Sequence, residues 1–286
     1  MEDLSPAKTI FSGGFMGFLS DVVEAMFFRT DSMQYWHASL YGLSAVRGEI
    51  RNTERLKEHE AIAYEVLLPK GLSNFSDESP FVFFFHSAQF NMSYNMQQVA
   101  FLAEGGLPVV MFDYRGSGRS QGLLSLEGML LDAELVWEKV CGCSVRKKKA
   151  ILLGQGVGAD ALLRFYSRHE RDVAAVVLES VYATQRGWIR DRYGPVIGDI
   201  CARLLKATDI QPIDIISQVT CPLIVLRPGK DEFIRDGEKR RFDEALPKGA
   251  EIWCVKGSRY LGIFSDNASP YRVKLFSWFN QHKLTR

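Results

Sequence analysis

The 286-residue sequence has no excess of charge of either sign, because 35 lysines and arginines oppose 34 aspartates and glutamates for a net charge of +1. This balance gives no electrostatic reason to expect nucleic acid as a partner. Cysteines are few: the five are odd in number and lie mostly in apolar contexts, which favours free thiols in a reducing compartment over a disulfide framework. Cys141 and Cys143 have a spacing that can begin a metal site, but no second cluster of Cys or His completes it. We therefore expect no metal and no other cofactor.

The amino terminus lacks the positively charged stretch of a secretory signal peptide, since it begins Met-Glu-Asp. An apolar stretch at residues 9–20 follows, but Lys8 and Asp21 bound it and leave it too short to span a bilayer. Apolar residues from 10 to 26 recur near a helical period, which predicts an amphipathic helical segment within residues 1–47.

Two interpretations of this N-terminal segment stay open. The helix can pack on the protein's own core or on a second subunit of a homo-oligomer, and we favour this packing role. Alternatively, residues 9–28 make peripheral contact with a membrane. Both interpretations fit a cytoplasmic protein, which is membrane-associated in the second case.

The remainder of the chain, residues 48–286, has neither an internal repeat nor a low-complexity linker, and with 47% hydrophobic residues overall it predicts a single α/β domain. Short β-branched or aromatic runs alternate with segments of helical period, and the central runs are continuously apolar, as buried parallel strands are. This pattern predicts a mostly parallel sheet of about eight strands with helices on both faces. The predicted strands are 49–52, 61–68, 81–85, 109–112, 150–153, 174–178, 223–226 and 251–255.

Helices are predicted between these strands, with Ser125 and Ser269 as plausible helix starts. The segment 185–207 is longer than a simple crossover connection. It is either a lid over the carboxyl ends of the strands, where open α/β sheets bind ligands, or a pair of ordinary packing helices. The predicted helices outside it are 92–104, 126–140, 157–169, 237–246 and 270–281.

The clearest chemical motif is the run LLGQGVGA at residues 152–159, at a predicted strand-to-helix junction. Its Gly-x-?-x-Gly spacing is that of a nucleophile elbow, a sharp turn that projects a nucleophilic side chain over a sheet. The central residue here is Gly156, which adopts the strained turn without steric cost but offers no atom to attack a carbonyl carbon.

Four stretches in the same order resemble the α/β-hydrolase superfamily, in particular bacterial serine hydrolases of the YfhR-like and ABHD13-like group. The resemblance covers about residues 49–281 and implies an α/β-hydrolase fold. The stretches are FFHSAQFNMS at 84–93, similar to an oxyanion loop; DYRGSGRSQG at 113–122; the elbow at 152–159; and QPID at 211–214 continuing to CPL at 221–223.

The resemblance implies a Ser, Asp, His order of catalytic residues, and only the acid matches. GKDEFI at 229–234 resembles the acid loop and places Asp231 at the acid position. In VKGSRYL at 255–261 the position of the histidine base is Tyr260, and a tyrosine with a pKa of about 10 is a poor base near neutral pH.

Other polar residues of these motifs are candidate ligand-binding groups: His86, Ser87, Gln155, Gly156 and Tyr260. His86 is either a buried structural residue, as this histidine is in the family, or part of an unusual site. Backbone N–H groups can still form an oxyanion hole, although Ser87 replaces the usual glycine.

Two functions follow from this pattern. We favour a pseudo-hydrolase, which keeps the fold without ester-hydrolysing chemistry and binds an unknown small molecule or a protein partner. The alternative is an active ester, thioester or amide hydrolase with a noncanonical site, for example one built from Asp231, His86, Tyr260 and water, because a fold does not determine a function. Ser87, Ser180, Ser258 and Tyr260 are the candidates for a substitute nucleophile.

Overall fold

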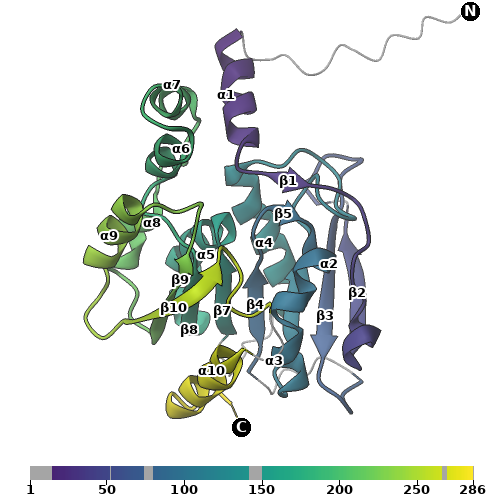
Figure 1. Cartoon of the computed structure of the whole chain (residues 1–286). Coiled ribbons are helices and arrows are strands. Elements are labelled where there is room, and N and C mark those ends of the chain that lie inside the picture. Colours follow the sequence, from purple (N-terminus) through teal and green to yellow (C-terminus); the bar gives the residue numbers. More distant parts are fainter. Residues whose placement is uncertain (1–14, 52, 74–79, 142–149, 266–268, 286) are drawn as a thin grey trace, which may run out of the picture.

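A computed structural model describes residues 15–51, 53–73, 80–141, 150–265 and 269–285. Its centre is an eight-stranded sheet in the spatial order β10-β9-β8-β7-β4-β6-β3-β2, shown in Figure 1. The β2–β3 and β3–β6 pairs are antiparallel and the other pairs are parallel. The strands are β2 (Ser44–Ile50), β3 (Ile62–Leu68), β4 (Val82–Phe85), β6 (Val109–Phe112), β7 (Ala150–Gln155), β8 (Val173–Glu179), β9 (Leu223–Lys230) and β10 (Glu251–Arg259).

Helices cover both faces of the sheet, and each face has its own hydrophobic core. Side chains of α4 and α5 fill one core, and side chains of α3 and α10 fill the other. Every residue of β4 and β7 is buried, as continuously apolar parallel strands should be. The helices are α1 (Phe15–Ala25), α2 (Met92–Asn95), α3 (Ala100–Glu104), α4 (Leu126–Cys141), α5 (Val157–His169), α6 (Gln185–Tyr193), α7 (Ile197–Leu204), α8 (Pro212–Ile216), α9 (Asp236–Glu244) and α10 (Pro270–Gln281).

The predicted architecture, a mostly parallel sheet of eight strands between two helical layers, is confirmed. Of the two predicted helix starts, Ser125 accepts a hydrogen bond on its Oγ from the Gly128 N–H at 3.0 Å, as an N-terminal cap does. The Ser269 hydroxyl instead donates to the Ile263 carbonyl oxygen at 2.7 Å, and Pro270 begins that helix.

The predicted helix 92–104 is wrong as a single element, because the structure divides it into α2, a short 3₁₀ helix (Met96–Gln98) and α3. The Asn95 side chain donates hydrogen bonds to the carbonyl oxygens of Gln89 and Asn91, at 2.8 and 2.9 Å. Such side-chain bonds to the backbone compete with a continuous helix. Val99 then leaves the helical region, with a φ of −132°.

The edge strand β2 differs from its prediction, because it begins at Ser44 rather than at residue 49. It pairs with β3 on one side only and most of its residues are exposed or half-buried, so it lacks the apolar run that marks a central strand. The expected boundary between residues 47 and 48 therefore falls inside this strand.

The N-terminal segment and the 185–207 segment lie together at one end of the sheet (Figure 1). Helix α1 contacts α7, and the short strand β1 (Arg29–Thr30) pairs with β5 (Gln89–Phe90) beyond the end of β4. Residues 1–14, which hold the first half of the apolar stretch at 9–20, lie outside the described part of the chain. In the described part, no helix is long and apolar enough to cross a membrane.

Candidate active site and adjoining cavity

The glycine-rich run forms the sharp turn from β7 into α5. Gly156 occupies its centre with φ 56° and ψ −124°, a backbone conformation that residues other than glycine rarely adopt. Gly158 allows close packing, since a Cβ at that position would lie 2.3 Å from the carbonyl oxygens of both Phe85 and His86. The strand-to-helix turn predicted from the glycine spacing is therefore present.

The hydroxyl of Tyr260 fills the space into which a side chain at the turn would project. A Cβ on Gly156 would lie 2.1 Å from the Tyr260 Oη and 3.2 Å from its Cζ. The Tyr260 ring packs on the Phe233 ring, with their centroids 4.5 Å apart. Burial raises the pKa of Tyr260 above its ordinary value, and the nearby charges of Asp231 and Glu179 raise it further. Tyr260 is therefore a neutral hydroxyl near neutral pH.

Asp231 lies in the loop between β9 and α9 and has two different carboxylate oxygens. Its Oδ1 accepts hydrogen bonds from the N–H groups of Phe233 and Ile234, at 3.0 and 2.9 Å. Its Oδ2 is buried, and the Ser180 side chain lies close enough to the carboxylate to form a hydrogen bond with it. Burial raises the pKa of this carboxyl group above its usual value. One oxygen thus caps the loop, and the carboxylate also lies near Ser180 and Tyr260.

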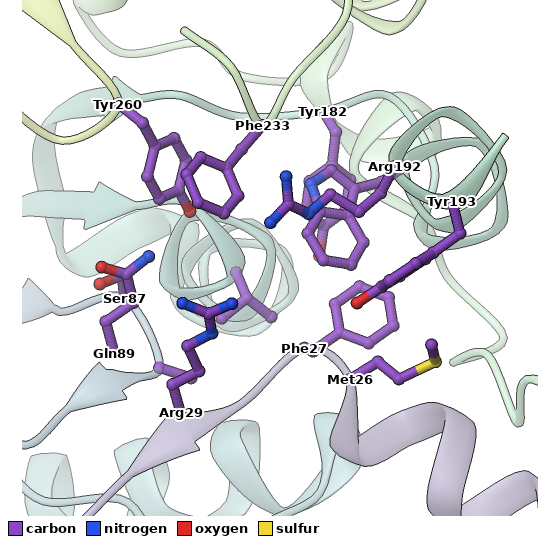
Figure 2. A pocket seen from close by; sticks show the side chains of 13 residues that line it. Met26, Phe27, Arg29, Ser87, Gln89, Tyr182, Arg192, Tyr193, Phe233 and Tyr260 are labelled. Atoms are coloured by element: carbon purple, nitrogen blue, oxygen red, sulfur yellow. The ribbon is translucent and has the colours of Figure 1, made fainter. Parts of the chain in front are cut away.

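A cavity of about 50 Å³ adjoins Gly156 and is lined by residues far apart in the sequence. Figure 2 shows Tyr260 and Phe233 at one end and Met26 and Tyr193 at the other, with two arginine side chains between them. Water occupies about 30 Å³ per molecule in the liquid, so the space admits a chemical group of roughly two water volumes. Helix α6 and the segment after α1 both contribute to the walls, including Phe27, Arg29, Trp188 and Arg192.

Aromatic packing holds these two segments over the cavity. The rings of Phe27 and Trp188 stack with centroids 4.4 Å apart, and Tyr182 lies 6.4 Å from Phe27 and 6.0 Å from Trp188. Phe27 and Trp188 are each less than a tenth exposed. The N-terminal segment is therefore part of the cavity wall rather than a separate appendage.

The predicted ligand-binding residues separate into two groups. Ser87 and Tyr260 line the cavity, and Gly156 lies beside both, since a Cβ on Gly156 would be 3.7 Å from the Ser87 Cβ and 2.1 Å from the Tyr260 Oη. His86 and Gln155 are fully buried and do not line the cavity. The structure thus brings three of the five predicted residues together at the turn.

His86 is enclosed by backbone atoms. Its Nδ1 lies 2.6 Å from the Ser87 carbonyl oxygen and its Nε2 lies 2.9 Å from the Phe112 carbonyl oxygen. Burial lowers its pKa to about 4, so the ring is neutral near pH 7. Of the two interpretations of His86, this environment favours the structural one.

Comparisons with known proteins agree with this fold. A family model described as "Serine aminopeptidase, S33" matches residues 78–207. YfhR of Escherichia coli O157:H7 is 35% identical to this chain over 199 residues, which are 68% of this chain and 67% of that protein. YfhR of Escherichia coli strain K12 is 36% identical over 101 residues, which are 35% of this chain and 36% of that protein. The chain belongs to the α/β-hydrolase superfamily. An esterase structure from Pyrococcus furiosus shares the fold, with a TM-score of 0.66 and 18% identity over 89% of this chain and 98% of that one.

This α/β-hydrolase chain carries two cavity residues that the sequence analysis missed, Arg29 and Arg192. Arg29 lies on a two-residue strand and Arg192 in the last turn of α6, and neither position has a local sequence pattern that marks a binding residue. Only the fold brings them to one cavity.

As for metals, the described residues contain no cluster of three or more His, Cys, Asp or Glu side chains able to hold an ion. Cys143 lies outside the described residues.

A second buried acid, Glu179, ends strand β8 behind the turn. Gln155 donates from Nε2 to Glu179 Oε2 at 2.6 Å, and the Ile263 N–H donates to Oε1 at 3.2 Å. Burial raises the pKa of Glu179 to about 7, and the charge of Asp231 contributes. The Oε1 of Gln155 has no hydrogen-bond partner in the described chain. This amide can therefore turn so that its Oε1 accepts a hydrogen bond from the protonated carboxyl group of Glu179.

Glu179→Gln is expected to remove part of the pH dependence of stability. The folded pKa of about 7 lies above the ordinary value of 4.5, so the folded protein binds more protons between these values and its stability falls as pH rises. The loss attributable to Glu179 is on the order of 3 kcal/mol by pH 8. In urea unfolding, the free energy of unfolding of the variant relative to that of the wild type should be higher at pH 8 than at pH 5.

The exposed residue Glu104 provides the matched control, because Glu104→Gln makes the same chemical change away from the core. It should leave the difference between pH 5 and pH 8 as it is in the wild type. If Glu179→Gln behaves like this control, Glu179 is not the group that retains its proton.

Proposed function

We propose that this protein is a pseudo-hydrolase, which uses the α/β-hydrolase fold to bind a ligand at the former catalytic turn instead of cleaving an ester. The observation that carries the proposal is the contact between Gly156 and Tyr260, because the Tyr260 Oη lies 2.1 Å from where a Cβ of a nucleophile would be. A hydroxyl that occupies the nucleophile's own space leaves no room for a serine and offers no base to activate one. Loss of either group lowers the rate of a triad enzyme by several orders of magnitude.

The size of the cavity supports binding of a small group in place of catalysis on a large substrate. Its volume of about 50 Å³ is well below the roughly 300–1,000 Å³ of pockets that enclose drug-sized ligands. Helix α6, within the 185–207 segment, supplies part of its wall, which fits the interpretation of that segment as a lid. The N-terminal segment supplies the opposing wall through Phe27 and Arg29, so we favour its packing role in this region over membrane contact.

The alternative, an active hydrolase with an unusual site, has one specific observation in its favour. Glu179 and Asp231 are neighbouring acids with raised pKa values, and perturbed acids gather at catalytic sites. Ser180 stands between strand and loop with a positive φ of 54°, and its buried Oγ lies close to the Asp231 carboxylate. Against this alternative, neither Glu179 nor Asp231 lines the cavity, and His86 faces backbone carbonyl oxygens instead of a substrate.

Hydrolysis of short- and medium-chain p-nitrophenyl esters tests the proposal. The purified wild-type protein is expected to release p-nitrophenol at the rate of the buffer alone, because no activated nucleophile faces the cavity. Asp231→Asn serves as the control against a contaminating esterase, since a contaminant's activity does not change with it. Turnover by the wild type that this variant abolishes would establish an active noncanonical hydrolase and overturn the proposal.

A further inference from the structure

Two arginines without acidic partners converge on the cavity. Figure 2 shows the guanidinium groups of Arg29, from β1, and Arg192, from α6, directed into the same space. Neither forms an ion pair with any described carboxylate, whereas Arg190 on the same helix pairs with Asp199. Arg192 instead lies over the Phe233 ring at 4.0 Å from its centroid. Two like charges at one cavity repel each other, and an anion bound between them offsets this repulsion by attracting both.

Further hydrogen-bond donors lie near the two arginines, in the part of the cavity next to Tyr260. Ser87 is only 1% exposed, yet its Oγ has no hydrogen-bond partner in the described chain, and it lines the cavity. Val157, the first residue of α5, lines it as well, and the first N–H groups of a helix have no partner within that helix. The 13-residue α5 thus directs the positive end of its dipole toward the cavity. Asp231 and Glu179 do not line it.

The other end of the cavity is apolar. Met26, Phe27, Trp188 and Tyr193 form its wall, and Figure 2 shows Met26 and Tyr193 on the side away from Tyr260. A ligand that fits both ends has an anionic head and a short hydrocarbon tail. The planar, two-oxygen carboxylate matches the paired N–H donors of a guanidinium group and requires little more volume than the cavity offers.

We propose that this cavity binds a small carboxylate with an apolar tail, its head held between Arg29 and Arg192 and its tail against Phe27 and Trp188. The inference rests on the proposed binding function, but the two fail differently. Ester turnover by the wild type would overturn the pseudo-hydrolase function, while a lack of carboxylate binding would overturn only the ligand class.

Calorimetric titration of the 286-residue protein with propionate, whose tail is only two carbons long, tests this proposal. We expect saturable binding at one site, and Arg29→Gln or Arg192→Gln should weaken it about tenfold or more, because each removes a charge-assisted hydrogen-bond donor. Arg192→Lys keeps the charge but not the planar fork, so it should weaken binding less than Arg192→Gln. Arg186→Gln, an exposed site on the same helix outside this cavity, is the matched control and should bind as the wild type does.

Two further ligands identify the chemistry. Propylamine has a tail of similar length with a positive head, and we expect no binding. Inorganic phosphate has the anionic head alone, and it should bind more weakly than propionate because it buries no apolar surface. Binding of propylamine as tight as that of propionate, binding of phosphate as tight as that of propionate, or propionate binding that survives both arginine substitutions would each overturn the proposal. Far-UV circular dichroism confirms that every variant compared is folded.

Discussion

Gly156→Ser is expected to destabilise the folded protein by about 2–6 kcal/mol, the largest effect of any single substitution proposed for this protein. Two physical causes contribute. At φ 56° and ψ −124° a serine backbone is strained, which costs about 1–3 kcal/mol. Its Cβ would also approach the Tyr260 Oη to 2.1 Å, and overpacking of a filled site costs about 1–3 kcal/mol more. Urea unfolding of the variant and the wild type measures the loss.

A double-mutant cycle separates the two causes. Tyr260→Phe removes the Oη and leaves the Cζ, at 3.2 Å, as the nearest atom to the new Cβ. In this background the cost of Gly156→Ser should fall by about 1–3 kcal/mol, because contact is relieved and strain is not. Gly194→Ser is the matched control for strain alone, since Gly194 has a φ of 82° and open space around its Cβ position. It should destabilise less than Gly156→Ser. A cost at Gly156 that stays the same without the Tyr260 hydroxyl would show that the two residues do not compete for one space.

Much of the fold follows from local sequence, as β4 and β7 illustrate. Their continuous apolar runs predict buried parallel strands, and the structure contains them in full. The edge strand β2 begins earlier than predicted, because a strand paired on one side and largely exposed needs no apolar run. The helix expected at 92–104 divides where the Asn95 side chain hydrogen bonds to the carbonyl oxygens of Gln89 and Asn91, and residue types alone do not show that this side chain turns back to the backbone.

The candidate site was also predictable in part, because some of its features follow from local sequence. The glycine spacing around Gly156 requires a sharp turn, and family resemblance places Asp231 and Tyr260 in loops near it. Sequence alone does not indicate that the Tyr260 hydroxyl enters the space above Gly156, because that contact depends on how far the loop after β10 extends. Arg29 and Arg192 are a stronger case. Arg29 precedes all the hydrolase-like motifs and Arg192 lies far along the chain from it, between the turn at 152–159 and the acid loop, so they meet only because β1 pairs with β5 and α6 contributes to the same cavity wall.

Restoring a nucleophile and a base together is expected to produce esterase activity that neither change produces alone. Gly156→Ser supplies the nucleophile at the turn, and Tyr260→His both removes the blocking hydroxyl and places an imidazole in the same loop. Family resemblance places Asp231 at the acid position, and its buried carboxylate lies near residue 260, so we expect it to orient that imidazole. A general base contributes about 10²–10⁴-fold to such a reaction. We therefore expect the double variant to hydrolyse p-nitrophenyl acetate at least about tenfold faster than Gly156→Ser, since its geometry has not been optimised.

The pH profile and a third substitution make this expectation specific. Activity of the double variant should rise with pH as the new imidazole loses its proton, near its ordinary pKa of about 6.5. Adding Asp231→Asn should reduce the rate, because the imidazole then lacks its orienting carboxylate. If Gly156→Ser alone turns over as fast as the double variant, the base is not at position 260. If the double variant folds but stays at the rate of the buffer with the imidazole deprotonated, the turn has lost more than its nucleophile and base, and the loop at Ser87 that lines the cavity becomes the next element to restore.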